Sequence, residues 1–342
     1  MTETDTRADI SIYSRRAALQ LGLGVVGAGA LPGMAFAQGG YPNKALTLTV
    51  GYSPGGQTDF AGRVVTEGMQ SSLGQPVVID NKPGVNGNIA TDYILKSPPD
   101  GYRLLVGNGS NMTLNPHTYR NTVVADPLKM TPIGLLLTSP LVLVVPPTLP
   151  VKDLAEFIAW VKAEDKAGKA VDYGSGGPGS LVQTAMELFR ERIGKPKMSH
   201  VPYKGSSPAM VDLMAGRIAA MFDATSVVAP FVNSGKLKPL MITSAKRSAA
   251  FPNVPTAAES GIKDFEIISF IGLYGPPGLP ADIVTKLNTA LNAAFKSANV
   301  QKTITDRGDD PGGGTPEQLA KLTRDYFKVW GDVVKANDIR AE

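Results

Sequence analysis

The chain has 342 residues, of which 43% are hydrophobic, and this length is enough for two ordinary domains with buried cores. Its formal net charge of +4 is spread along the sequence without a basic run, which argues against a nucleic-acid-binding surface. The chain has no cysteine, so thiol catalysis, zinc–thiolate sites and disulfide bonds are excluded.

The first 37 residues have the layout of a secretory signal peptide. Ser14-Arg15-Arg16 precedes a modestly apolar stretch, residues 17–31, and the small-residue segment Ala35-Phe36-Ala37 follows. The paired arginines resemble a twin-arginine signal. The apolar stretch is too short and too rich in glycine for a membrane span of about 20 residues. We therefore expect cleavage near Ala37 and an exported, periplasmic protein that begins near Gln38.

After residue 45, predicted strands alternate with predicted helices through glycine-rich loops. In the first part of the chain we expect strands at 46–52, 77–81 and 102–106 and helices at 59–73 and 88–95. Such alternation predicts an α/β fold with a parallel, doubly wound sheet.

A second set of elements begins at a predicted strand at 141–145. Helices are expected at 151–167, 181–193, 209–215 and 280–297, and strands at 170–173, 200–203, 218–223, 237–243 and 270–274. Tyr326, Phe327 and Trp330 are expected to pack a C-terminal helix. The order predicts two doubly wound lobes joined by crossover strands. Lobe 1 takes residues 38–139, lobe 2 takes 140–265, and 266–342 return to lobe 1. Ligands bind at the carboxyl ends of such strands, and a hinge between lobes permits closure.

The segment Gly51-Tyr52-Ser53-Pro54-Gly55 matches the G-x-S-x-G elbow of serine hydrolases. That elbow uses the backbone N–H of the residue after the serine, and Pro54 has none. His117 and His200 are the only histidines, and neither lies in a recognisable motif. A secreted serine hydrolase using Ser53 is retained as the alternative function.

Nucleotide and metal sites have weaker support. Gly174, Gly176 and Gly179 satisfy G-x-G-x-x-G, but the acidic residue expected about 20 positions later is missing. No segment has the spacing of a zinc or calcium site. We expect no cofactor and no metal.

Four loops rich in glycine, serine, asparagine or threonine end strands or open helices: 53–58, 107–113, 174–180 and 204–208. Helix N-termini offer unpaired N–H groups and partial positive charge to an anion. The loops together predict an anion site. Asp59 and Asp223 either contact a ligand ammonium group, favouring an amino acid, or only cap local structure and orient water.

Several blocks of sequence match a known family. They are SPGGQTD (residues 53–59), LGQPVVIDNKPG (73–84), PDGY (99–102), VPYKG (201–205) and DLMAG (212–216). Through these blocks, the chain after the predicted signal peptide resembles the substrate-binding receptors of tripartite tricarboxylate transporters, the Bug-type periplasmic proteins. The chain departs from the family's usual residues at Ser53 and at Phe270, where a tryptophan is common, which leaves the ligand's size open.

The resemblance implies a Venus-flytrap protein that holds a small organic carboxylate (a di- or tricarboxylate, an amino acid or an aromatic acid) and passes it to an integral-membrane permease. It implies no chemical step, and we expect a monomer. Sensing of the ligand without transport is an alternative. By position, the ligand contacts would be Ser53, Gly55, Gly56, Gln57, Thr58 and Asp59 in the first lobe and Gly176, Gly177 and Ser180 in the second, with Tyr203 and Asp223 nearby. Asn108 and Ser110, from the loop at 107–113, complete the predicted site.

Overall fold

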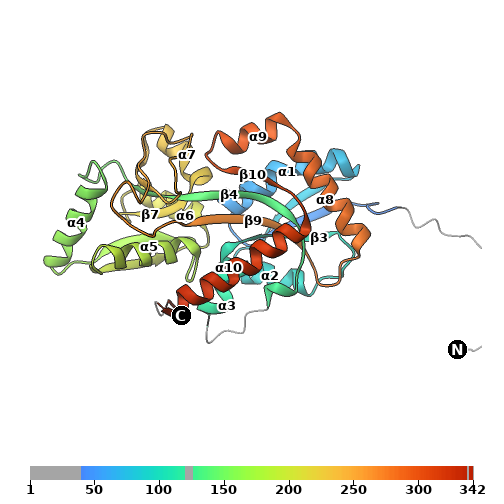
Figure 1. Cartoon of the computed structure of the whole chain (residues 1–342), viewed down its shortest axis with the longest axis horizontal. Coiled ribbons are helices and arrows are strands. Elements are labelled where there is room, and N and C mark those ends of the chain that lie inside the picture. The colour runs from blue at the N-terminus through green and yellow to red at the C-terminus, as the bar shows by residue number, and fades with distance from the viewer. Residues whose placement is uncertain (1–39, 120–125, 337–338, 342) are drawn as a thin grey trace, which may run out of the picture. The chain divides into compact units, whose positions relative to one another are not determined.

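One long strand, β4 (Thr131–Val145), is shared by two parts of the central sheet (Figure 1). The computed structural model describes residues 40–119, 126–336 and 339–341; the predicted signal peptide and its cleavage site lie outside them. At about 3.3 Å per residue, the 15 residues of β4 extend over roughly 50 Å. Its first ten residues pair with β9 (Ile268–Gly275), and its last residues pair with β7 (Met221–Ala224) and β8 (Lys238–Ile242).

The remaining elements lie around this strand. The other strands are β1 (Leu46–Val50), β2 (Val77–Asn81), β3 (Arg103–Asn108), β5 (Val171–Ser175), β6 (Met198–Pro202) and β10 (Asp310–Gly313). The helices are α1 (Gln57–Leu73), α2 (Asn88–Leu95), α3 (Asn115–Thr118), α4 (Leu154–Lys166), α5 (Leu181–Arg192), α6 (Ser206–Met214), α7 (Thr225–Asn233), α8 (Ala281–Phe295), α9 (Ala298–Thr305) and α10 (Pro316–Ala336). Short helical turns are η1 (Val85–Gly87), η2 (Ser110–Leu114) and η3 (Pro127–Lys129).

The sheet is mixed. Its main path runs β10-β4-β9-β3-β1-β2, and β5 pairs with β6 in a separate two-stranded sheet. β1 pairs in parallel with β2 and β3, whereas β9 is antiparallel to both β3 and β4. The prediction of an α/β fold is confirmed. The prediction of a parallel sheet is correct for β1 with β2 and β3 and for β5 with β6, and wrong for β7, β8, β9 and β10, which all pair antiparallel with β4.

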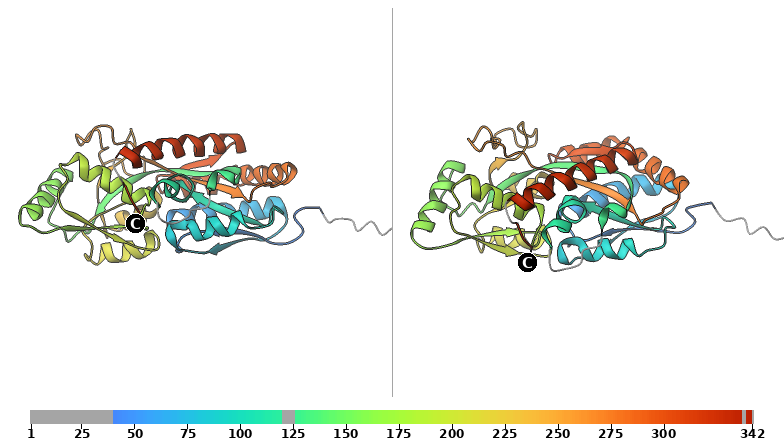
Figure 2. Two further views of the ribbon diagram at one scale, coloured as in Figure 1. Left: turned by 90° about the horizontal axis from the view of Figure 1, so that it is seen from below. Right: turned by 60° about the horizontal axis from the view of Figure 1, so that its bottom comes forward.

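Alternate side chains of the sheet pack into different cores. Leu104 and Val106 of β3 belong to a core with α1 and α8, whereas Leu105 between them packs with residues of α2 and α10. This is the two-residue period of a strand covered by helices on both faces. A third core contains the end of β4 together with α4 to α7, β7 and β8. Figure 2 shows α10 (dark red) running along the sheet.

Helix α10 contributes to more than one core. Leu319, near its start, packs with Leu105 and Phe270, whereas Trp330 and Val334, near its end, pack with the residues around α5. Its 21 residues correspond to about 32 Å, enough to reach both groups. Within the described chain, no helix is apolar over the length that a bilayer crossing requires.

Several predicted boundaries differ from the structure. β2 and α2 occupy the predicted ranges, but residues 107–113, predicted as a loop, contain the end of β3 and most of η2. The side-chain oxygen of Asn108 accepts bonds from the backbone N–H groups of Ser110 and Asn111, at 2.9 and 3.1 Å, and this begins a helical turn at once. Helices α7 and α9 and strand β10 were not predicted from the sequence. Helix α7 starts directly after β7 with no intervening loop.

Candidate functional site

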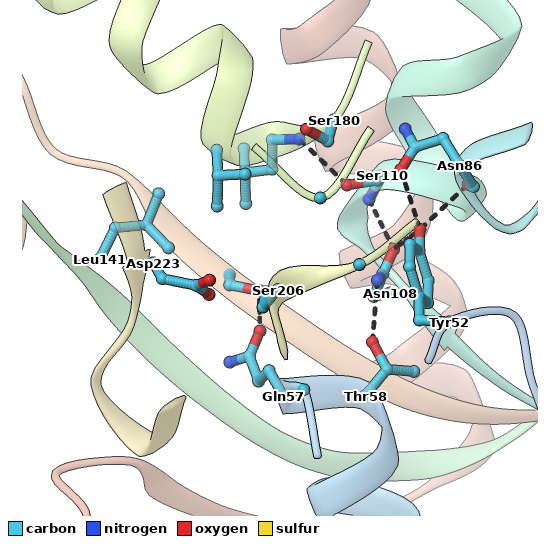
Figure 3. Close-up of a pocket in the computed structure, with 16 residues that line it drawn as sticks. Tyr52, Gln57, Thr58, Asn86, Asn108, Ser110, Leu141, Ser180, Ser206 and Asp223 are labelled. Atoms are coloured by element: carbon cyan, nitrogen blue, oxygen red, sulfur yellow. Dashed lines mark hydrogen bonds between the residues drawn. The ribbon is translucent and has the colours of Figure 1, made fainter. Parts of the chain in front are cut away.

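A cavity of about 50 Å³ lies where α1, α5 and α6 begin (Figure 3). One water needs about 10–15 Å³ of such volume, so the space suits a small polar molecule or group. Its lining residues are Tyr52, Gly56, Gln57, Thr58, Asn86, Asn108, Ser110, Leu141, Gly176, Ser180, Leu181, Val182, Gly205, Ser206, Asp223 and Ser269. Of these, none is a lysine, arginine or histidine.

The start of α1 supplies one wall. Its N-cap, Gly56, makes no side-chain cap bond, so no N-cap side chain occupies the amides of the first turn. Gln57 and Thr58 follow. The side-chain oxygen of Gln57 accepts a 2.9 Å bond from Ser269 on β9, and the hydroxyl of Thr58 accepts one of 2.9 Å from the amide of Asn108. These bonds fix the first turn relative to the sheet.

Asn108 is the centre of a polar network beside the cavity. Besides its bonds to the backbone of η2, its side-chain oxygen accepts a 3.1 Å bond from the hydroxyl of Tyr52 (Figure 3). The same hydroxyl donates to the backbone carbonyl of Asn86 at 3.0 Å. Burial raises the pKa of Tyr52, so this residue is a hydrogen-bond donor at neutral pH. Asn86 has a positive φ of 48°, as does Val85 at 46°, and such backbone strain is concentrated at functional sites.

The starts of α5 and α6 supply the facing wall. Ser180 caps α5 by accepting a bond from the N–H of Gln183, and the N–H of Leu181 donates to the hydroxyl of Ser110 at 3.0 Å. Gly205, the N-cap of α6, has no side-chain cap bond and adopts a φ of 123°, which strongly favours glycine. Ser206 follows at the first position of the helix.

Asp223 is the one acidic residue in the cavity wall. It is 2% exposed, and one carboxylate oxygen accepts a 2.8 Å bond from the N–H of Ala224. The other oxygen has no hydrogen-bond partner among the described residues. Burial raises the pKa of Asp223 to about 6, against the lowering effect of the Ser206 hydroxyl and the Ala224 N–H, and the nearby Asp309 raises it further.

Two loops meet beside the cavity. The hydroxyl of Ser53 donates to the carbonyl of Lys204 at 2.8 Å, and the hydroxyl of Ser207 donates to the carbonyl of Pro54 at 2.7 Å. A Cβ on Gly205 would lie 3.3 Å from the backbone nitrogen of Ser53, so a side chain there would press on the opposite loop. The residues 53–56 and 204–207 therefore close one side of the site.

The thirteen predicted ligand contacts divide into two groups. Eight line the cavity: Gly56, Gln57, Thr58, Asn108, Ser110, Gly176, Ser180 and Asp223. Of the other five, Ser53, Gly177 and Tyr203 line a larger neighbouring cavity of about 590 Å³. Gly55 faces the Ser207 hydroxyl, which would lie 3.0 Å from an added Cβ.

Asp59, the fifth, serves its own loop. Its carboxylate accepts bonds from the N–H of Gly55 at 2.9 Å, from Arg63 at 2.9 Å and from the amide of Asn81 at 3.0 Å. Burial alone would raise its pKa, but the bonds from Arg63, Gly55 and Asn81 lower the pKa of Asp59 below its usual value. It does not line the cavity, so of the two alternatives in the sequence analysis the local structural role fits Asp59.

Eight lining residues were missed: Tyr52, Asn86, Leu141, Leu181, Val182, Gly205, Ser206 and Ser269. Gly205 and Ser206 belong to the loop at 204–208 that the sequence analysis singled out. Leu141 and Ser269 come from β4 and β9, and no local sequence signal marks them.

The geometry does not support the hydrolase alternative. Ser53 donates its hydroxyl to a backbone carbonyl. His200 pairs with Ser175 at 2.6 Å, and His117 pairs with the carbonyl of Phe327 at 3.0 Å. Neither histidine is a base for Ser53. Among the described residues, no group of three or more histidine, aspartate or glutamate side chains is placed to hold a metal ion.

Comparisons with known proteins show which family the chain resembles in sequence and in fold. The model of the tripartite tricarboxylate transporter family receptor matches residues 61–339. The chain is 36% identical to protein BugT of Bordetella pertussis over 300 residues, which cover 86% of this chain and 90% of BugT. It is similar to the structure of MatC from Rhodopseudomonas palustris with bound malate (TM-score 0.81, 31% identity, 86% and 100% of the two chains). It is equally similar to that of R. palustris Rpa4515 with adipate (TM-score 0.82, 32% identity, 88% and 99% of the chains).

Proposed function

The chain belongs to the tripartite tricarboxylate transporter receptor family, and we propose that it binds a small organic carboxylate in the cavity at the starts of α1, α5 and α6. It would then deliver this ligand to the integral-membrane subunits of a transporter. No chemical step is part of the proposal. The related structures with malate and adipate support carboxylates as the ligand class.

The observation that carries the proposal is the convergence of three helix N-termini on one cavity. The N-caps of α1 and α6 are glycines without side-chain cap bonds. Each helix start contributes partial positive charge, and the starts of α1 and α6 also offer N–H groups that no N-cap side chain occupies, which suits an anion. At α5, the N–H groups of Leu181 and Gln183 are already bonded to Ser110 and Ser180. Hydroxyl groups of Thr58, Ser180 and Ser206 line the same space.

The energies are sufficient without a basic side chain. A hydrogen bond to a charged group contributes about 1.5–3 kcal/mol, and micromolar affinity requires about 8 kcal/mol net. Three to five such bonds from different elements therefore reach this range, after allowance for ordering costs. Because the donors come from residues more than 100 positions apart in the chain, they act together only when the two loops are in contact.

We propose that closure of two lobes traps the ligand. As predicted from the sequence, lobe 1 would comprise residues 38–139 and 266–342, and lobe 2 would comprise 140–265. The bonds of Ser53 to Lys204 and of Ser207 to Pro54 would then hold the closed form. The strand β4, shared by two cores, and the segment before β9 would be the connections that bend.

The periplasmic location is also part of the proposal. The predicted twin-arginine-type signal peptide at residues 1–37 supports it, as does membership of a family of transport receptors. A monomer that binds the permease only in its ligand-bound form would fit this role.

A thermal-shift screen tests the proposal. The protein from Gln38 onward is heated with di-, tri-, amino- and aromatic carboxylates, each over a concentration series. A ligand that binds only the native state raises the melting temperature once its concentration exceeds the dissociation constant. A saturable shift with one chemical class supports the receptor, whereas no shift with any of them, for folded protein, contradicts it.

A further inference from the structure

We infer that Asp223 accepts the ammonium group of the ligand, so that this receptor selects amino carboxylates over the matching carboxylates that lack the amino group. The inference rests on the proposed function and names the ligand class of the same site.

The unpartnered oxygen of Asp223 is the first argument. The side chain is almost completely buried, and only one of its oxygens is hydrogen-bonded, to the N–H of Ala224. Figure 3 shows the carboxylate pointing into the cavity, towards Ser206. A buried carboxylate oxygen without a partner is costly, and a cationic hydrogen-bond donor is the group that removes this cost most effectively.

The position of Asp223 is rigid. It lies in β7, where its neighbour Ala224 pairs with Leu141 of β4 and Asp223 itself pairs with Val142. Moving Asp223 to the other face of the sheet would require a one-residue shift in the pairing of β7 with β4. The carboxylate is therefore a fixed feature of the cavity wall.

The opposite chemistry is present in the same space. The amide nitrogen of Gln57 is buried and has no hydrogen-bond partner among the described residues. Its orientation is set because the amide oxygen accepts the bond from Ser269. The cavity thus offers donors, from Gln57 and the helix starts, and one ionisable acceptor, Asp223. This pairing matches a molecule that carries a carboxylate and an ammonium group.

The other buried carboxylates nearby differ. Both oxygens of Asp59 are occupied by protein donors, and the residue lies outside the cavity. One oxygen of Asp309 accepts bonds from Ser139, Thr225 and the N–H of Ser226, and its other oxygen has no partner among the described residues, but Asp309 does not line the cavity. Of these three residues, Asp223 alone combines an open oxygen with a place in the cavity wall.

Calorimetric titration with matched pairs tests the inference. The matched pairs are L-aspartate and succinate, L-glutamate and glutarate, L-alanine and propionate, and L-phenylalanine and 3-phenylpropionate. L-malate is added because a neutral hydroxyl group replaces the ammonium group of aspartate in it. In every pair that binds, we expect the amino member to bind at least tenfold more tightly, because a charge-assisted bond is gained. Malate is expected to bind more weakly than aspartate.

The variant Asp223→Asn should abolish this preference, bringing the affinities of the two members of each pair to within threefold of one another. Asp309→Asn is the matched control, because it removes a buried carboxylate outside the cavity, and it should keep the preference. Equal or tighter binding of the members without an amino group, or of malate, overturns the inference and leaves the receptor proposal intact. The inference is also overturned, with the receptor proposal intact, if the only carboxylates that bind lie outside these pairs. Absence of binding by every carboxylate in the wider screen overturns the proposed function and this inference with it.

Discussion

The hydroxyl of Ser53 donates a 2.8 Å hydrogen bond to the backbone carbonyl of Lys204, 151 residues later in the chain. The relationship is reciprocal between the loops, because Ser207, close to Lys204, donates to the carbonyl of Pro54, next to Ser53. The serine that resembles a hydrolase nucleophile therefore takes part in a loop-to-loop contact beside the candidate site.

Removing one of these hydroxyls should weaken ligand binding without abolishing it. A single hydrogen bond contributes about 0.5–1.5 kcal/mol, so Ser53→Ala and Ser207→Ala are each expected to lower affinity about 2- to 12-fold. Ser71→Ala, on the exposed side of α1, is the control and should bind as the wild type does. Calorimetry measures the three. Unchanged affinity of both Ser53→Ala and Ser207→Ala would show that this loop contact does not support ligand binding.

Gly205→Ala should impair both stability and binding. With φ at 123°, an alanine is strained by about 1–3 kcal/mol, and its Cβ would press on Ser53. Gly235 also has a positive φ, of 70°, but has no atom within 4 Å of an added Cβ. Both variants are expected to melt at lower temperature, but only Gly205→Ala should lose affinity, by tenfold or more. Equal affinities of the two would show that the loop contact is irrelevant to binding.

The network at Asn108 should tolerate little change. Asn108→Ala leaves the hydroxyl of Tyr52 and the N–H groups of Ser110 and Asn111 without their acceptor, and we expect a loss of about 3 kcal/mol in the free energy of unfolding. Asn108→Asp keeps the acceptor and loses only the bond to Thr58, so its loss should be smaller. Urea unfolding measures the free energy of unfolding of both variants. A larger loss in Asn108→Asp than in Asn108→Ala would contradict the role of Asn108 as a hydrogen-bond acceptor.

The stability of the unliganded protein should depend on pH through Asp223. Because its pKa is raised to about 6 in the folded state, from 3.8, its contribution to stability is full below pH 3.8 and is lost as pH rises through 6. A shift of this size corresponds to about 3 kcal/mol. Asp223→Asn should therefore gain about that much stability relative to wild type between pH 4 and pH 8.

Comparing the wild type with Asp223→Asn isolates the contribution of Asp223 to the pH dependence of stability. Burial lowers the pKa of His200 to about 4, which acts in the opposite direction, and burial raises the pKa of Asp309, but both residues are present in both proteins. Urea unfolding at one-unit steps of pH gives the difference. A difference that is flat from pH 4 to pH 8 would show that Asp223 titrates normally.

Local sequence signals predicted the local parts of this structure. Glycine-rich segments after apolar strands marked the starts of α1, α5 and α6, and these starts supply much of the cavity wall. The signals did not place Leu141 and Ser269, which reach the cavity through the pairing of β4 with β7 and β9. They also did not distinguish Asp59 from Asp223, because the choice depends on which donors, such as Arg63 and Asn81, fold against each carboxylate.

The most direct test of the central claim is calorimetric titration of a cavity-filling variant with a carboxylate that binds the wild type. Ser206→Leu replaces a hydroxyl oxygen by three carbon atoms in the wall of a cavity of about 50 Å³, and Ser72→Leu makes the same change on the exposed face of α1. The account predicts one ligand per chain for the wild type and for Ser72→Leu, and no measurable binding for a folded Ser206→Leu protein. Unchanged binding by Ser206→Leu would place the ligand elsewhere and contradict the assignment of this cavity.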